Sequence, residues 1–87
     1  MKLTVKLYAT LSHYLPGDAT EHAVTVDVEP DATPFSVIDR FKVPRESAHL
    51  VLVNGVYVAP SDRESPVLKE GDTLAVWPPV AGGGNIL

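Results

Sequence analysis

The sequence contains no cysteine, and this absence excludes several kinds of chemistry. Disulfides, thiolate metal sites and cysteine nucleophiles cannot form in the chain, which is compatible with a reducing cytosol. No apolar run approaches the ~20 residues that a membrane-spanning helix needs. The first residues alternate between polar and apolar, so we expect no signal peptide. Together these absences favour a cytoplasmic protein without a membrane partner.

Clustered basic charge is also scarce. The net charge is -4, and close basic residues occur only at Lys2 with Lys6 and within residues 40–45. Binding to nucleic acid needs a basic stripe, so we expect no nucleic-acid partner. The acidic surface either suits a basic protein partner or only aids solubility.

No set of residues with the pattern of an active site is present. The three histidines, His13, His22 and His49, fall in different segments and lack metal-ligand spacing. No serine has the context of a nucleophile elbow. The glycines at 82–84 are not followed by Lys-Ser/Thr or a helix, so they do not form a phosphate loop. We therefore expect no catalytic site, no metal and no bound cofactor.

Two segments near the start have the alternation of half-buried strands. Residues 2–8 and 21–30 each place apolar side chains at every second position, and a short helical turn with Leu11 and Leu15 lies between them. We expect an antiparallel pair of strands. The side chains predicted to face the core are Leu3, Val5, Leu7, Val24, Val26 and Val28.

One segment has the spacing of a short helix. Thr33 can cap a helix that starts at Pro34, and Pro44 stops it near Lys42. Spacings of three and four place the apolar residues on one face. They are Phe35, Val37, Ile38 and Phe41.

The second half of the sequence predicts three further strands. Asn54-Gly55 favours a type I′ turn between residues 50–53 and 56–59. A polar connection with a tight turn at residues 70–72 leads to a strand at 73–77. In that strand we expect Leu74 and Val76 to face inward and Ala75 and Trp77 to face outward, before Pro78-Pro79 stops pairing.

The element order is strand, strand, helix, strand, strand, strand. One helix must cover one face of the sheet, because no other element is available. We therefore predict an α+β fold, a β-grasp roll with a mixed sheet of about five strands under one main helix. The first and last strands would be central and parallel. Residues 1–81 would form the domain, and residues 82–87 a flexible glycine-rich tail.

The last residues, PPVAGGGNIL, have an unusual composition. Gly-Gly can thread a slot too narrow for any side chain, and the preceding prolines form a stiff extended stalk. Residues 80–83 would span at most about 13 Å at roughly 3.3 Å per residue, enough to enter a deep pocket of another protein. By itself, a glycine tail is also consistent with a disordered end.

Three segments and their spacing resemble the ubiquitin-like sulfur-carrier family. They are KLYATL, VLVNGVYV and LKEGDTLAVWPPVAGG. The resemblance extends through Gly83, and Pro-Pro-Val before the diglycine is more similar to the small subunit of molybdopterin synthase than to the thiamine-pathway carrier. It implies a β-grasp fold whose terminal glycine, Gly83 after Gly82, is adenylated with ATP and magnesium by an E1-like enzyme. It also implies conversion to a thiocarboxylate, whose sulfur the large subunit of molybdopterin synthase transfers to a pterin precursor.

The sequence departs from the family pattern after the diglycine. Gly84, Asn85, Ile86 and Leu87 follow, and only a terminal carboxylate can be adenylated. In the interpretation we favour, a protease removes the extension and exposes Gly83 or Gly84. In the other, the extension stays, and the protein is a divergent binding module or protein modifier.

Two aromatic residues are candidates for docking to a partner. If the first and last strands are neighbours, Tyr8 and Trp77 share the face opposite the core, near the start of the tail. We expect them to form the partner interface together with Pro78, Pro79 and Val80. The alternative is that the two rings only cover the edge of the sheet.

Overall fold

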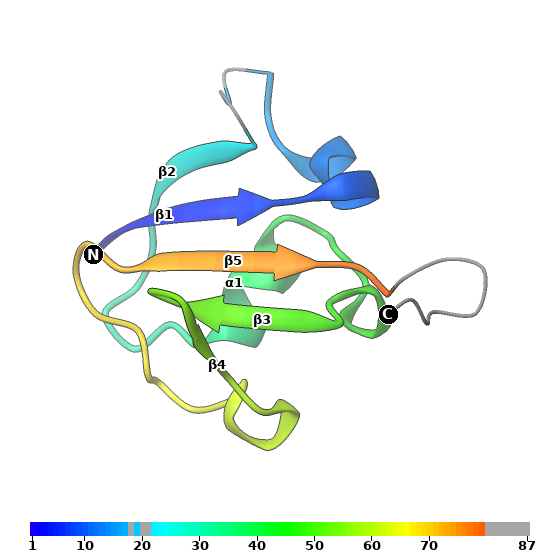
Figure 1. The fold of residues 1–87 in the computed structure, drawn as a ribbon. Coiled ribbons are helices and arrows are strands. Elements are labelled where there is room, and N and C mark those ends of the chain that lie inside the picture. Colours follow the sequence, from blue (N-terminus) through cyan, green and yellow to red (C-terminus); the bar gives the residue numbers. More distant parts are fainter. Residues whose placement is uncertain (18, 20–21, 80–87) are drawn as a thin grey trace.

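The computed structural model describes residues 1–17, 19 and 22–79, and it forms one five-stranded sheet with a helix behind it (Figure 1). Short 3-10 helices fill three of the connections. The strands are β1 (Lys2–Leu7), β2 (Ala23–Asp27), β3 (Leu50–Val53), β4 (Val56–Tyr57) and β5 (Thr73–Trp77); the helices are α1 (Pro34–Arg40), η1 (Ala9–Tyr14), η2 (Arg45–Ser47) and η3 (Pro60–Asp62).

The strand order confirms the predicted β-grasp roll. The sheet runs β2-β1-β5-β3-β4. Its two central strands, β1 and β5, are parallel, with Thr4 opposite Thr73 and Leu7 opposite Val76. All other neighbouring pairs are antiparallel. The parallel pair points the ends of β1 and β5 toward the same edge of the molecule.

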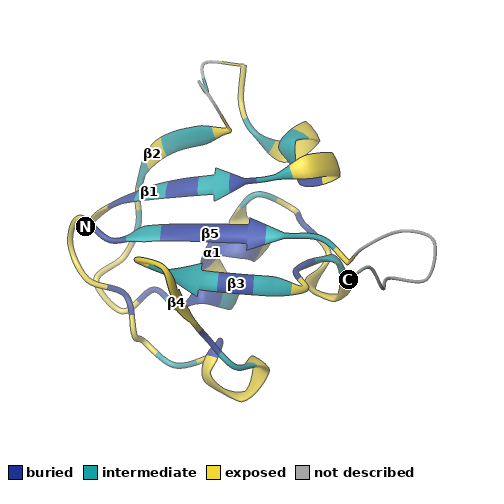
Figure 2. Cartoon of the chain, in the orientation of Figure 1, coloured by how far each residue is buried: buried dark blue, intermediate teal, exposed yellow. Residues whose placement is uncertain are grey.

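The core lies between the sheet and α1, and it contains the side chains that the alternation predicts. Figure 2 shows the buried residues concentrated along β1, β5 and the helix behind them. Ala75 lies on the outer side of β5 as predicted, but it is also buried. Its register partners are Lys6 and Leu52, which are longer and flank its single methyl group. The most buried members of the core are Leu3, Val5, Leu7, Val37, Ile38, Val51, Leu74 and Val76.

The helix starts as predicted and ends earlier. Thr33 Oγ1 accepts from the Ser36 backbone N–H, and Ser36 Oγ accepts from the Thr33 N–H, which forms a capping box. The expected end near Lys42 is wrong, because α1 ends at Arg40. Lys42 has a left-handed φ of 64°, and the Val43 N–H donates to the Ile38 carbonyl at 3.2 Å. This is a Schellman closure of the helix.

The Asn54-Gly55 turn is confirmed. Both residues have positive φ, 52° and 84°, as a type I′ turn requires. The second strand of the hairpin is shorter than expected, because β4 ends at Tyr57 and the chain turns into η3 at Pro60. None of the helices in the described residues is long and apolar enough to cross a membrane.

Candidate docking surface

The candidate surface lies where the two central strands end. The Tyr8 N–H donates to the Val76 carbonyl at 3.1 Å, which continues the parallel pairing one residue past β1. β5 ends at Trp77, and Pro78 and Pro79 follow it, half-buried and exposed respectively. The segment that leads to the glycines therefore starts directly beside Tyr8.

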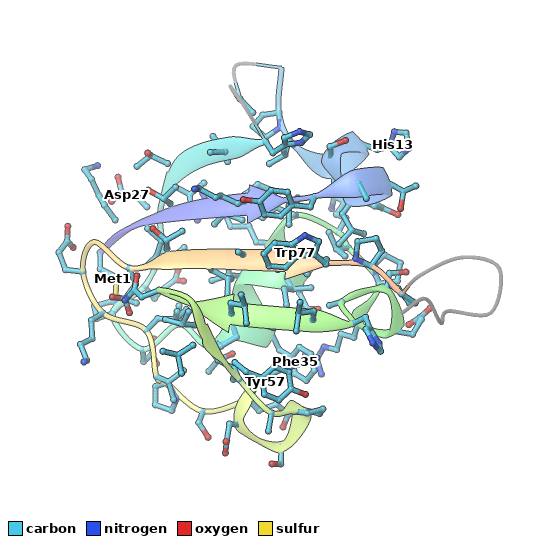
Figure 3. All side chains as sticks on the ribbon, viewed as in Figure 1. Met1, His13, Asp27, Phe35, Tyr57 and Trp77 are labelled. Carbon is cyan, nitrogen blue, oxygen red and sulfur yellow. The ribbon has the colours of Figure 1, made fainter. Side chains whose placement is uncertain are left out.

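Tyr8 and Trp77 stack on the outer face of the sheet, as their predicted shared face allows. Their ring centroids are 4.3 Å apart and the planes differ by 5°. Figure 3 shows Trp77 on the side of the sheet that α1 does not cover. Both side chains are half-buried, so each ring shields one face of the other while their outer surfaces stay accessible. A preformed aromatic platform loses little conformational entropy on binding, which suits an interface anchor.

His22 extends the platform, a contribution that the sequence interpretation missed. Its ring lies 5.6 Å from that of Tyr8, with 29° between the planes. The His22 carbonyl accepts from the Leu7 N–H at 3.0 Å, which fixes its position at the start of β2. Alternation along β2 and its partner Leu7 would place His22 on the core side, but its left-handed φ of 66° interrupts the alternation just before β2. We call Tyr8, His22 and Trp77 the aromatic stack.

Two leucines continue the apolar surface from Trp77 across β3. Leu50 is the register partner of Trp77, and Leu52 is that of Ala75. Both are half-buried on the outer side. The run LVLV is apolar at every position, which is typical of a strand with both faces covered. Here the described residues cover only one face, so the outer face is suited to a partner.

The ion pair on the outer face lies away from this surface, whereas Lys6, opposite Ala75, borders it. Lys2 and Asp27 form an exposed ion pair of 2.8 Å at the opposite end of β1. The hydrogen bond between them raises the pKa of Lys2 and lowers the pKa of Asp27, so the pair stays ionised. Near the stack, the backbone N–H of His49 donates a hydrogen bond to the Trp77 carbonyl at 2.9 Å. A partner could bury the stack and both leucines without desolvating the Lys2–Asp27 pair.

The described residues contain no group of three or more His, Asp or Glu side chains placed to hold a metal ion. The arrangement is that of a binding surface, with no constellation for acid–base or nucleophilic chemistry in that part of the chain. The proposed sulfur-bearing Gly83, with Gly82 and Gly84, and the interface residue Val80 lie outside the described residues. Their roles stay predictions.

Comparison with protein families gives one match, to the family described as Mut7-C ubiquitin. The match covers residues 1–82, nearly the whole chain, and stops within the glycine run. The comparison with curated proteins gave no significant match.

Several solved structures share the fold over most of their length. SAMP1 from Haloferax volcanii is 29% identical with a TM-score of 0.63, covering 95% of this chain and 100% of its own. The HVO 2177 protein from Haloferax volcanii is 27% identical with a TM-score of 0.75, covering 95% and 87%. A putative molybdopterin converting factor subunit 1 from Pyrococcus furiosus is 23% identical with a TM-score of 0.57, covering 91% and 98%. The last likeness concerns the fold alone.

Proposed function

Since the chain belongs to the Mut7-C ubiquitin family, we propose that it is a ubiquitin-like carrier whose glycine segment is activated by an E1-like enzyme. One observation carries the proposal: the central strand β5 ends at Trp77 of the half-buried aromatic stack, and in the sequence Pro78-Pro79 and then the glycines follow. The stack would anchor the partner, and the prolines would direct the glycines away from the domain.

The chemistry requires a free carboxylate on the glycine. An oxygen of that carboxylate attacks the α-phosphorus of magnesium-bound ATP, pyrophosphate leaves, and an acyl adenylate forms. Hydrosulfide, or a donor that delivers sulfur at the same oxidation level, then attacks the acyl carbon, AMP leaves, and a thiocarboxylate remains. The E1-like enzyme supplies ATP, magnesium and the catalytic groups, and this chain supplies only the reacting carboxylate.

Residues that follow the activated glycine, Gly83 or Gly84, must be removed before this chemistry. The Gly83 carbonyl is in a peptide bond with Gly84, and an amide carbonyl cannot serve as the nucleophilic carboxylate. We propose that a protease cuts after Gly83 or Gly84. Ile86 and Leu87 are also too wide for a channel fitted to glycine.

For the destination of the sulfur we propose molybdopterin synthesis, with the large subunit of molybdopterin synthase as acceptor. The supporting feature is Pro-Pro-Val before the diglycine, which resembles the small subunit of that enzyme. A second candidate is attachment of the glycine to lysines of other proteins. The 29% identity to a protein named small archaeal modifier protein 1 favours it.

Intact mass of the protein recovered from its native host tests the shared steps. We expect species that end at Gly83 or Gly84, part of them heavier by about 16 Da because sulfur replaces one carboxylate oxygen. A protein uncut after both glycines in all material contradicts the carrier function. Conjugates joined to lysine by an isopeptide bond would identify a protein modifier. Co-purification with a synthase large subunit would identify a sulfur donor in molybdopterin synthesis.

A matched pair of chains tests the site itself. A chain that ends at Gly83 should be adenylated without a protease, as measured by ATP–pyrophosphate exchange with the host E1-like enzyme. The same chain with Gly83→Ala should lose nearly all exchange, because the methyl group does not fit a glycine channel. If the alanine chain exchanges normally, the assignment of Gly83 is wrong.

A further inference from the structure

The edge strand β2 borders a groove that differs in charge from the molecule as a whole. The groove encloses about 380 Å³ on the helix side of the sheet. Among the described residues, two cations line it and no carboxylate does, although the chain has a net charge of -4. Its lining residues are Tyr14, Pro16, Val26, Arg40, Phe41 and Lys42.

The backbone of β2 presents hydrogen-bonding groups beside this groove. Met1 and Val28 exchange both backbone hydrogen bonds, and the Leu7 N–H donates to the His22 carbonyl, so the even-numbered residues of β2 face β1. Their odd-numbered neighbours, Ala23, Thr25 and Asp27, therefore point their N–H and C=O groups outward. β2 is the last strand at its side of the sheet (Figure 1). In the described part of the chain, no strand pairs with that edge.

The core is incompletely covered at the same place. Val24, Val26 and Val28 point toward the helix side but are only half-buried, whereas their neighbours Leu3 and Val5 are 1% exposed. An additional strand beside β2 would place every second side chain over these valines. Burying their remaining apolar surface would stabilise such a complex.

The two cations are held at this edge by the fold. The Arg40 guanidinium donates a hydrogen bond to the outward-facing carbonyl of Asp27. Lys42 occupies the left-handed position of the Schellman closure, and its N–H donates to the Asp39 carbonyl at 2.9 Å. Both side chains are exposed. On the helix side of the Asp27 end, a carboxylate on a strand added to β2 would meet Arg40 and Lys42, while the Asp27 carboxylate is paired with Lys2 on the outer face.

We propose that this edge binds an extended, acidic and apolar segment of a partner protein as an additional strand. Apolar side chains of the segment fill the groove over Val26 and Phe41, and its carboxylates pair with Arg40 and Lys42. A second copy of this chain is a poorer occupant. If two β2 strands paired antiparallel about Thr25, Ala23 of one copy would lie opposite Asp27 of the other, near Arg40. Alanine has no carboxylate that could pair with Arg40 there. The site lies on the helix side, apart from the aromatic stack, and does not depend on activation of the glycines.

A synthetic peptide tests the proposal on the full chain. The probe is acetyl-Glu-Glu-Val-Thr-Val-Thr-Val-Glu-Glu-amide, which has acidic residues at both ends because the strand direction is open. Its control replaces all four Glu by Lys. With the acidic probe we expect NMR shifts along β2 and slower hydrogen exchange of the Ala23, Thr25 and Asp27 amides. The lysine peptide should produce neither effect.

A charge reversal within the groove supplies the matched comparison. Lys42→Glu should weaken binding of the acidic probe by about fivefold or more, because attraction becomes repulsion. Lys69→Glu changes the net charge equally at an exposed lysine outside the groove and should change affinity less than about twofold. Equal loss in both variants overturns the proposal. It is also overturned if the two peptides bind equally, if the shifts fall on β4 or the aromatic stack, or if dilution shows that β2 pairs with a second copy.

Discussion

Tyr8 and Trp77 stack almost parallel, 4.3 Å apart, on the side of the sheet that the helix leaves uncovered. Tyr8 follows β1 and Trp77 ends β5, so the contact depends on the parallel pairing of the first and last strands. The platform is thereby fixed to the most central strands of the molecule. Its position beside Pro78 places it next to the start of the segment that leads to the glycines.

Replacement of Trp77 tests this platform. Trp77→Ala should weaken binding to the host E1-like enzyme by roughly 30-fold, because truncating a central aromatic anchor commonly costs about 2 kcal/mol. Titration calorimetry with the chain ending at Gly83 measures the affinity. Tyr57→Ala removes an aromatic side chain that is 54% exposed on the edge strand β4 and should change the affinity less than about twofold. Similar losses in both variants would show that the stack has no special role.

The buried arginine supports a second prediction, on stability. Arg63 is 4% exposed and donates to the carbonyls of Val58, Ala48 and His49 at 3.0, 2.9 and 3.2 Å. Arg63→Met should lower the free energy of unfolding by about 3 kcal/mol, because it leaves buried carbonyls without donors.

Arg63→Lys should also destabilise the protein, since an ammonium cannot reproduce the planar fork of donors. Urea unfolding measures both changes. Lys69→Met serves as the control at an exposed position and should stay within about 0.5 kcal/mol of the parent. A lysine at position 63 that preserves full stability would mean that charge, and not geometry, matters there.

The hairpin turn gives a third prediction. Gly55 has a φ of 84°, with nothing within 4 Å of the position a Cβ would take. Gly55→Ala should therefore cost about 1 kcal/mol through backbone strain alone. Gly17 has equal space and no left-handed φ, so Gly17→Ala should change the free energy of unfolding by less than about 0.5 kcal/mol. If Gly55→Ala and Gly17→Ala lowered the free energy of unfolding equally in thermal or urea unfolding, this explanation would be contradicted.

A fourth prediction concerns pH. Arg45 contacts Asp39 at 2.8 Å, and its hydrogen bond lowers the pKa of Asp39 below the ordinary 3.8. The unfolded chain thus takes up this proton more readily than the folded one. The pair stabilises the protein above about pH 4, and that contribution is lost as the pH falls through the lower folded pKa.

Asp39→Asn should therefore lower the Tm slightly at pH 7, and the difference should shrink between about pH 4 and pH 2. Arg45→Met removes the same pair, and in addition a guanidinium 4.4 Å from the centre of the Phe35 ring. The Tm of this variant should fall further at pH 7, and part of that decrease should remain at acidic pH. A constant Tm difference for Asp39→Asn from pH 7 to pH 2 would show that the pair contributes nothing.

Local patterns predicted most of the fold because each depends on a few neighbouring residues. Period-two alternation in β1 and the Asn54-Gly55 dipeptide are decided within the segment itself. Element ends were less accurate, since the end of α1 depends on the left-handed Lys42 and the end of β4 on the turn at Pro60. Neither lysine nor a lone proline marks such an end reliably.

The candidate site was predicted in part for the same reason. Tyr8 and Trp77 were placed on one face by alternation, whereas His22 joins them against the alternation of β2, through its left-handed φ of 66°. Arg63 was missed because its partners are three carbonyls from two places in the chain, residues 48–49 and residue 58. The pattern of side chains in a sequence does not indicate backbone acceptors. An arginine in a polar segment is therefore predicted to be a surface residue even where it is buried.

The central position of β5 has a consequence for synthesis of the protein on the ribosome. β5 is the last strand to be made among those described, yet it lies between β1 and β3 and joins the two halves of the sheet. Until it emerges, β1 and β3 have no common neighbour, and the long-range pairing of Thr4 with Thr73 cannot form. The domain and its aromatic stack would therefore fold only after β5 has been translated. An activating enzyme that recognises the stack would not bind truncated products that lack β5.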